Sequence, residues 1–274
     1  MRILLSGAEG QLGRVVRSGF GTHEVIAPSE AELDICDRRK VEATLDQTRP
    51  DLLLNAAAYT DVDGAESDPE TAFAGNARGP GILAVATGQR GIPMVHISTD
   101  YVFDGEAGRP YDERDETSPC TVYGRSTLEG EEAVRQSNPR HFVVRTAWLY
   151  AAQGRNFPRT MIEHAERPEV RVVNDQFGSP TFAPHLAAGL LKLIETTSWG
   201  TYHLAGGGVA SWHQFASALY RELGIETPVR PVPTSEFPRP ARRPRFSALT
   251  TIEEPRILLP RWEDGLEALV AEIS

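Results

Sequence analysis

Residues 2–13 read RILLSGAEGQLG and set the architecture of the whole chain. The apolar run at residues 2–6 predicts a short buried strand. Glycines follow at Gly7, Gly10 and Gly13, and residues 14–20 then have the spacing of a helix. In dinucleotide-binding folds such glycines allow a tight turn, close approach of a pyrophosphate and close packing of helix on strand, while the helix N-terminus faces the phosphates. A glycine-rich turn without a ligand is the alternative interpretation.

Strands and helices continue to alternate after this first unit. Apolar runs predict strands at residues 24–29, 51–55 and 94–97, and helical spacing predicts helices near 38–47 and 69–89. Such alternation is typical of an α/β fold, a Rossmann-type doubly wound parallel sheet with helices on both faces. We expect residues 1–150 to form this dinucleotide-binding domain.

The alternation loosens after residue 150, where loops rich in proline and glycine interrupt the chain. Helices are expected at 184–196, 212–223 and 263–273. Residues 151–274 are therefore expected to form mainly a smaller C-terminal α/β substrate lobe, from which some segments can return to the first domain. The ligand cleft is expected between the two, at the carboxyl ends of the strands.

Composition excludes several classes of protein. The 274 residues carry a net charge of −10, which argues against non-specific binding to nucleic acid or to an anionic membrane. No stretch has the length and apolarity of a membrane span or a signal peptide. Cys36 and Cys120 are the only cysteines and predict two reduced thiols. We therefore expect a soluble cytoplasmic protein, and no residue spacing indicates a metal site.

Hydroxyl and carboxyl side chains follow the strand at residues 94–97, and a tyrosine follows on the next helix. Ser98, Thr99 and Asp100 stand at the strand end, while Tyr123 and Thr127 are four residues apart and share one helical face. A hydroxyl can bind a carbonyl oxygen while a tyrosine gives it a proton and a hydride arrives from elsewhere. This pattern fits the reduction of a carbonyl, and on this segment alone an ordinary strand–loop–helix with a surface tyrosine fits equally well.

Several long motifs in order carry a family resemblance over essentially the whole chain. They are GAEGQLG (7–13), NAAAYTDVDGAE (55–66), ISTDYVFDG (97–105), VYGRSTLEGE (122–131), VVRTAWLYAAQGRNFPRTM (143–161), VVNDQFGSPTF (172–182), HLAGGGVASWHQFA (203–216) and RPARRPRFSAL (239–249). The chain resembles the extended short-chain dehydrogenase/reductases and, within them, the dTDP-4-dehydrorhamnose reductase family. The resemblance implies transfer of a hydride from NADPH or NADH to C4 of a dTDP-4-keto-6-deoxyhexose, in dTDP-L-rhamnose synthesis. It also allows a homodimer.

The resemblance implies roles for particular residues. Thr99 corresponds to the hydroxyl that binds the keto oxygen, and Tyr123 to the proton donor. Cofactor contacts are implied at Gly7, Gly10, Gln11, Leu12, Asp34, Ile35, Ala56, Ala57, Ala58, Tyr59, Asn76, Ser98, Tyr123 and Thr127. Substrate contacts are implied at Thr99, Asp100, Val102, Phe103, Tyr123, Trp148, Asn156 and Arg243.

The chain departs from the family at Thr127, where the family motif Tyr-x-x-x-Lys has lysine. That lysine would hold the nicotinamide ribose and lower the pKa of the tyrosine from about 10. Threonine keeps a hydroxyl but carries no charge, and Arg125 lies about 200° around the helix from Tyr123. We predict a loss of about 10²–10⁴ in rate. An impaired or repurposed natural homologue, a rearranged proton relay and a deliberate substitution all fit the sequence.

Other assignments stay open from sequence. Ser29 and Glu30 end the second strand without an arginine, so NAD and NADP remain equal candidates. Asn76 is either buried with backbone partners or a surface residue, and Trp148 alone fits core packing. The arginines at 239, 242, 243 and 245 suit a diphosphate or form a solvated loop.

Two other functions also fit the sequence. A member of this reductase-like family serves methionine adenosyltransferase as a regulatory subunit, so a catalytically impaired NADP-binding subunit is the first alternative. A reductase or epimerase of another nucleotide deoxysugar is the second.

Overall fold

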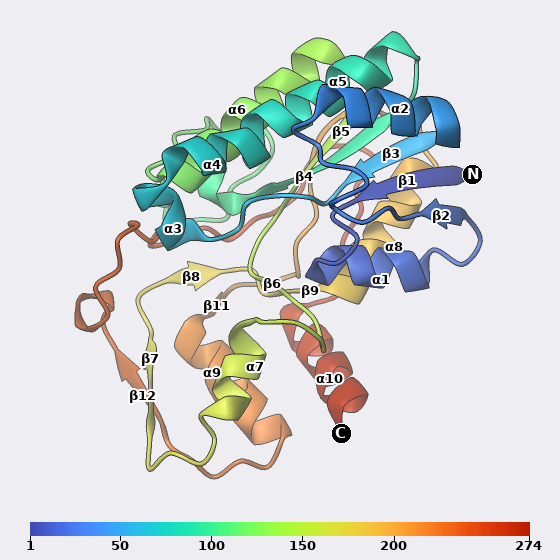
Figure 1. Ribbon diagram of the computed structural model, residues 1–274. Helices are drawn as coiled ribbons and strands as arrows, with labels where there is room; N and C mark the ends of the chain where they lie inside the picture. The colour runs from blue at the N-terminus through green and yellow to red at the C-terminus, as the bar shows by residue number, and fades with distance from the viewer.

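The computed structural model of residues 1–274 is built on one six-stranded parallel sheet (Figure 1). Its strand order is β10-β5-β4-β3-β1-β2, and every neighbouring pair is parallel. The strands are β1 (Arg2–Ser6), β2 (Glu24–Ile26), β3 (Leu52–Asn55), β4 (Met94–Thr99), β5 (His141–Thr146) and β10 (Gly200–His203). The predicted doubly wound parallel sheet is confirmed.

The order of the strands reverses between β1 and β3. From β1 the chain adds β2 on one side, then returns to add β3, β4, β5 and β10 on the other. Ser6 and Asn55 end these two central strands side by side. Ligands of doubly wound sheets bind in the crevice outside the carboxyl ends of the strands at such a reversal. This edge is therefore the expected place for a cofactor.

Helices cover both faces of the sheet. The helices α1 (Gln11–Gly19) and α8 (Ala183–Ile194) pack together on one face, and α2 (Arg38–Thr48), α5 (Gly79–Gln89) and α6 (Val122–Ser137) cover the other (Figure 1). Side chains alternate between the two layers along β1: Ile3 and Leu5 belong to the core under α1 and α8, and Leu4 to the core under α2 and α5. Burial on both faces explains why the central strands are apolar throughout.

The helix predicted at residues 69–89 is interrupted. It consists of α4 (Pro69–Phe73), a π-helical turn η1 (Ala74–Arg78) and α5, and is preceded by the short α3 (Val62–Ser67). The wider turn contains Asn76, whose carbonyl lies so close to α6 that a Cβ on Gly130 would come within 2.0 Å of it. Helical periodicity does not reveal such a turn, which is often found at functional sites.

The second lobe lies on the other side of the strand ends and has its own core. It contains α7 (Phe157–Glu163), α9 (Trp212–Glu222) and α10 (Trp262–Ile273), around a core that includes Tyr150 and Phe215 (Figure 1). Three short strand pairs border it: β6 (Leu149–Tyr150) with β9 (Thr181–Phe182), β8 (Phe177–Gly178) with β11 (Ala210–Ser211), and β7 (Val170–Val173) with β12 (Val229–Val232). Two 3₁₀ turns, η2 (Asp100–Val102) and η3 (Thr234–Glu236), complete the elements.

Between residues 183 and 203 the chain lies in the sheet body, where it forms α8 and β10. The domain boundary at residue 150 stays a prediction. Two strand ends differ by two or more residues from those expected: β2 ends at Ile26 instead of continuing to Ser29, and β4 continues through Ser98 to Thr99. No helix has the length and apolarity that crossing a membrane requires. Cys36 and Cys120 are both free thiols.

Candidate active site

The glycine turn after β1 forms a cradle at the reversal of strand order. Gly7 has φ +75°, and a Cβ at this position would lie 2.4 Å from the backbone nitrogen of Ala57. Gly13 packs as closely, since its Cβ would lie 2.1 Å from the Gly7 carbonyl oxygen. Gly10 caps α1 without a side-chain hydrogen bond, so the first N–H groups of the helix are free to bind an anion. The turn therefore fits a dinucleotide pyrophosphate.

A chain of buried hydrogen bonds holds the floor of this cradle. The Asn55 side-chain oxygen accepts from the Ser6 hydroxyl at 2.7 Å and from the Ala57 backbone N–H at 3.2 Å. Its amide nitrogen then donates to His96 Nδ1 at 3.0 Å. Burial lowers the pKa of His96 to about 4, which keeps the imidazole neutral as this bond requires. The polar Asn55 in an apolar strand was the available sequence signal for this support.

Asn76 fixes the loop that follows the floor. Its side chain accepts from the Tyr59 backbone N–H at 2.8 Å and donates to the Tyr59 carbonyl at 3.0 Å and to the Ser126 hydroxyl at 3.1 Å. Of the two interpretations, Asn76 is therefore the buried residue with backbone partners. Its carboxamide connects the strand-end loop to α6.

At the adenosine end, several predicted side chains are already engaged. Asp34 accepts from the Cys36 backbone N–H at 2.9 Å, and Asp37 caps α2 through the N–H groups of the next turn. The Ser29 hydroxyl donates to Glu32 at 2.7 Å. Ile35 and Leu12 are core residues, with 8% and 4% of their surface exposed. The side chains of Ile35 and Leu12 therefore serve mainly to pack the core.

Thr99 and Tyr123 meet where β4 ends and α6 begins. Thr121 caps α6 by accepting from the Gly124 N–H at 3.0 Å, which places Tyr123 in the first helical turn. Burial raises the pKa of Tyr123 to about 12, a hydrogen bond with Thr99 opposes this rise, and the charge of Asp100 adds to it. Tyr123 is therefore a neutral phenol near the Thr99 hydroxyl, and a carbonyl oxygen between them could bind both.

Thr127 supplies neither charge nor a free proton to this pair. Its hydroxyl donates to the Tyr123 backbone carbonyl at 2.9 Å, and only 5% of the residue is exposed. No cation is among the groups that shift the pKa of Tyr123. Of the two lysines, Lys40 donates to the Ala31 carbonyl and Lys192 lies in the last turn of α8. The relay that a lysine would provide is absent.

A buried ion pair supports the carboxyl end of β4 through a hydrogen bond with Ser98. Glu131, with 0% exposed, accepts from Arg145 Nε and Nη2 at 2.8 Å each, from Arg135 at 2.9 Å and from the Ser98 hydroxyl at 2.5 Å. Burial alone would raise the pKa of Glu131, but these partners lower it to about 2. The Ser98 hydroxyl is thus used inside the protein rather than for a cofactor. Neither Glu131 nor Arg145 was predicted from the sequence as part of the site.

On the substrate side, Asp100 is 2% exposed and its Oδ2 has no hydrogen-bond partner, while Oδ1 accepts from the Thr99 hydroxyl at 3.1 Å. Burial raises the pKa of Asp100 to about 6. Val102 and Phe103 are core residues, and the Phe103 ring stacks on Tyr111. The side chains of Val102 and Phe103 therefore do not face a ligand.

Trp148 is neither an ordinary core residue nor a free platform. It has a positive φ of 46°, and its indole stacks on Trp212 with the ring centroids 3.5 Å apart and 2° between the planes. Trp212 is held by a hydrogen bond to Gln176 at 3.2 Å and by Phe157 against its ring. Trp212 was not predicted from the sequence as part of the site, because its partner Trp148 lies on a distant segment.

Asn156 and the arginine cluster also make contacts within the protein. Asn156 caps α7 and donates to Gln11 at 3.0 Å, which joins the C-terminal lobe to the glycine turn after β1. Arg243 pairs with Asp63 at 2.8 Å, and Arg242 pairs with Glu106. Arg245 is exposed and has no carboxylate partner. The cluster is therefore largely neutralised, and a diphosphate would have to compete with these carboxylates.

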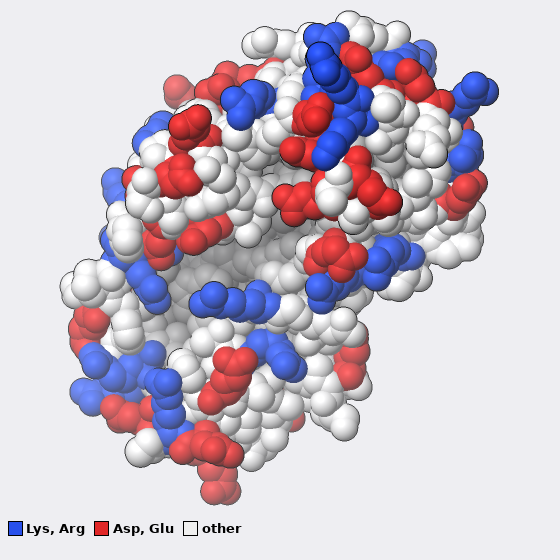
Figure 2. Space-filling model, viewed as in Figure 1, with Lys and Arg blue, Asp and Glu red and all other residues white.

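The surface is hollowed between the sheet body and the lower lobe, with charged side chains around the rim and an uncharged floor in this view (Figure 2).

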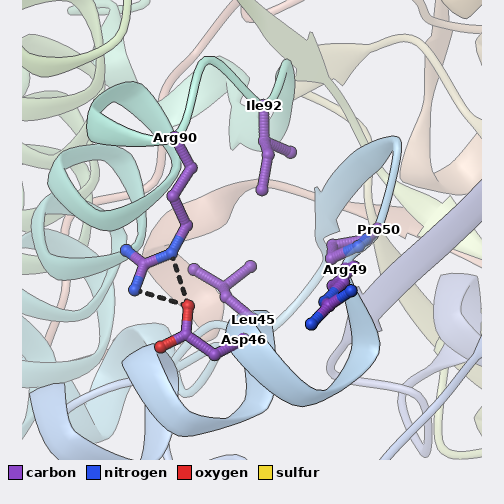
Figure 3. Close-up of a pocket in the computed structure, with 6 residues that line it drawn as sticks. All are labelled: Leu45, Asp46, Arg49, Pro50, Arg90 and Ile92. Carbon is purple, nitrogen blue, oxygen red and sulfur yellow. Dashed lines mark hydrogen bonds and ion pairs between the residues drawn. The ribbon is translucent and has the colours of Figure 1, made fainter.

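A second, separate pocket lies at the other end of the sheet (Figure 3). It is lined by Leu45, Asp46, Arg49, Pro50, Arg90 and Ile92, and the ion pair between Arg90 and Asp46 crosses it. Pro50 and Ile92 precede β3 and β4, so this pocket is remote from the strand ends that carry Thr99. No group of three or more His, Cys, Asp or Glu side chains could hold a metal ion.

The chain is similar to known proteins along its full length. A family model described as the RmlD substrate binding domain matches residues 1–274. The dTDP-4-dehydrorhamnose reductase of Salmonella typhimurium is 40% identical over 293 residues, which cover 100% of this chain and 98% of that protein. A crystal structure of a dTDP-4-dehydrorhamnose reductase from Clostridium acetobutylicum has a TM-score of 0.95 at 40% identity and covers 100% of this chain and 99% of that one. The Bacillus anthracis enzyme in complex with NADP has a TM-score of 0.96 at 37% identity, covering 99% of each chain.

Proposed function

The chain belongs to the dTDP-4-dehydrorhamnose reductase family, and we infer that it reduces the C4 keto group of dTDP-4-dehydro-6-deoxy-L-mannose to give dTDP-L-rhamnose. NADPH or NADH supplies the hydride when bound. The observation that carries this function is the neutral Tyr123 phenol near the Thr99 hydroxyl, which ends β4 at the same edge of the sheet as a glycine cradle that fits a dinucleotide.

The roles of the two residues follow from their protonation. The raised pKa keeps Tyr123 protonated at neutral pH, so its phenol can give a proton to the oxygen that becomes the C4 hydroxyl. Thr99, whose hydroxyl donates to Asp100 Oδ1 in the free protein, turns its proton to the same oxygen when substrate binds and fixes its position. Reduction needs a proton donor rather than a base, so a phenol with a high pKa is in the useful form.

Thr127 sets the limit on the rate. The phenol must be re-protonated after each turnover, and neither Thr127 nor another nearby side chain offers a cationic relay. We therefore propose a working but slow reductase. Thr127 is also the observation that favours the alternative, a cofactor-binding regulatory subunit without catalysis. The complete Thr99–Tyr123 pair argues for the enzyme, because a regulatory subunit has no need of it. Assembly into a homodimer stays a prediction.

The test is Tyr123→Phe, with Tyr101→Phe as a matched control. The two rings contact each other edge to face, with centroids 5.4 Å apart, so each variant removes one phenol hydroxyl from the same neighbourhood. Tyr123→Phe should lower kcat at least about a hundredfold, the usual size of acid–base assistance, with NADPH affinity unchanged. Tyr101→Phe should stay within about tenfold of the unsubstituted protein. Equal losses in both variants would contradict the role of Tyr123 as proton donor.

A further inference from the structure

Four buried side-chain atoms in this protein have no hydrogen-bond partner: His96 Nε2, Asp100 Oδ2, Thr146 Oγ1 and Tyr150 Oη. Buried polar atoms are nearly always bonded, so each exception needs an explanation. Tyr150 lies in the core of the lower lobe, and His96 lies within β4, below the strand ends. Asp100 and Thr146 are different, since both stand at the carboxyl ends of the sheet.

Thr146 lies directly beside the residue that binds the keto oxygen. It ends β5 as Thr99 ends β4, and the two are paired in the parallel register. Along β5, Phe142 and Val144 face the same core as Val95 of β4. Alternation therefore directs Thr146 and Thr99 to the same side of the sheet, from strands about 4.8 Å apart. Thr146 is 7% exposed, so its hydroxyl is not satisfied by bulk water.

Asp100 follows Thr99 at the same end of the sheet. Its Oδ1 accepts from the Thr99 hydroxyl at 3.1 Å, the Ser247 hydroxyl also lies near the carboxylate, and Oδ2 is left without a hydrogen bond of ordinary length. An unused carboxylate oxygen accepts a hydrogen bond, and an unused threonine hydroxyl can both donate and accept. Together they match a ligand hydroxyl, which also donates and accepts.

The chemistry of the substrate identifies that hydroxyl. When Thr99 holds the oxygen on C4, the neighbouring carbons are C3, which carries a hydroxyl, and C5, which carries a methyl group in a 6-deoxyhexose. Only the C3 hydroxyl is polar and adjacent to the reacting carbon. We propose that Thr146, together with Asp100, binds the C3 hydroxyl of the keto-sugar and selects substrates that carry it. This inference rests on the reductase function proposed above, and it gives Thr146 a role in specificity.

The experiment compares Thr146→Val with Thr146→Ser by calorimetric titration. The ligands are dTDP-L-rhamnose, its 3-deoxy analogue and its 2-deoxy analogue. Valine keeps the shape of threonine and removes the hydroxyl, while serine keeps the hydroxyl. Thr146→Val should bind dTDP-L-rhamnose and the 2-deoxy analogue about five- to tenfold more weakly, the usual effect of one hydrogen bond, and should bind the 3-deoxy analogue as the unsubstituted protein does. Thr146→Ser should stay within about twofold for all three.

Two controls keep the result interpretable. An unpartnered buried hydroxyl does not stabilise the fold, so the urea midpoint of Thr146→Val should equal or exceed that of the unsubstituted protein. NADPH affinity should not change. Equal weakening of all three sugar nucleotides, or a change confined to NADPH, would overturn the proposal.

The reductase function is tested separately, by NADPH oxidation with the keto substrate. If the unsubstituted protein binds dTDP-L-rhamnose but does not oxidise NADPH, the proposed activity fails. The titrations then still decide whether Thr146 recognises the C3 hydroxyl.

Discussion

Replacing Glu131 by glutamine should destabilise the protein more than any surface substitution. The amide keeps the shape of the carboxyl but presents N–H groups to donors, and it leaves Arg145, only 4% exposed, without a counter-charge. The pKa of Glu131 falls from 4.5 to about 2, and each pKa unit is worth about 1.4 kcal/mol, which gives about 3–4 kcal/mol. Removal of one partner from other buried ion pairs costs about 3–5 kcal/mol. The two estimates agree.

The dependence on pH gives a second test of the same pair. Because the folded pKa is depressed, the stabilisation is complete above about pH 4.5 and is lost as the pH falls through about 2. The difference between the unsubstituted protein and Glu131→Gln should therefore narrow from about 3–4 kcal/mol at pH 7 to about 1 kcal/mol at pH 3. Urea unfolding of both proteins at pH 7 and at pH 3 measures this difference in stability.

Glu132→Gln is the matched control, since it makes the same chemical change on the exposed neighbour in α6. It should alter stability by less than about 0.5 kcal/mol at either pH. A loss below about 1 kcal/mol for Glu131→Gln at pH 7, or a loss that is the same at pH 3, would refute the assignment of a strongly paired buried carboxylate.

Three further results are expected. Gly13→Ala should destabilise the fold by about 1–3 kcal/mol, because its Cβ would overlap the Gly7 carbonyl. Gly19→Ala is the control and should leave the stability unchanged, because a Cβ at that position meets nothing within 4 Å. Thermal unfolding of both variants measures the difference. Trp212→Leu removes the ring that supports Trp148 and should therefore weaken binding of the sugar nucleotide. The measurement is the KM for the keto substrate, which should rise with little change in kcat. The value of kcat/KM should rise as the pH increases through about 6, because Asp100 ionises there. It should then stay constant up to about pH 10, because the Tyr123 phenol keeps its proton over that range. A fall in kcat/KM between pH 8 and 10 would contradict the high pKa of the phenol.

Features that depend on neighbouring residues in the chain were predictable. The turn at Gly7 requires a positive φ and a missing Cβ, and a glycine directly after a buried strand indicates both. Thr99 ends β4 and Tyr123 opens α6 as expected from sequence, and their catalytic role stays a prediction. Short-range chemistry of this kind identifies the cradle and the position of the proposed pair.

Features that depend on pairing between distant segments were not predictable. A charged residue such as Arg145 inside an apolar strand indicates a buried partner but does not identify Glu131. The stack of Trp148 on Trp212 joins two segments that the fold alone brings together. Conversely, Val102 and Phe103 lie within a motif next to the site, yet their side chains pack in the core. Motif membership indicates proximity to a site, whereas the direction of a side chain is set by packing.

NADPH oxidation with dTDP-4-dehydro-6-deoxy-L-mannose, measured on the unsubstituted protein and on Thr127→Lys, is the decisive measurement. Lysine would restore a cation four residues from Tyr123, lower the phenol pKa and supply a proton relay. We expect both proteins to oxidise NADPH, with Thr127→Lys faster by about 10²–10⁴. Equal rates would contradict the idea of a reductase limited by its missing lysine, and binding of NADPH without turnover by either protein would contradict the reductase function itself.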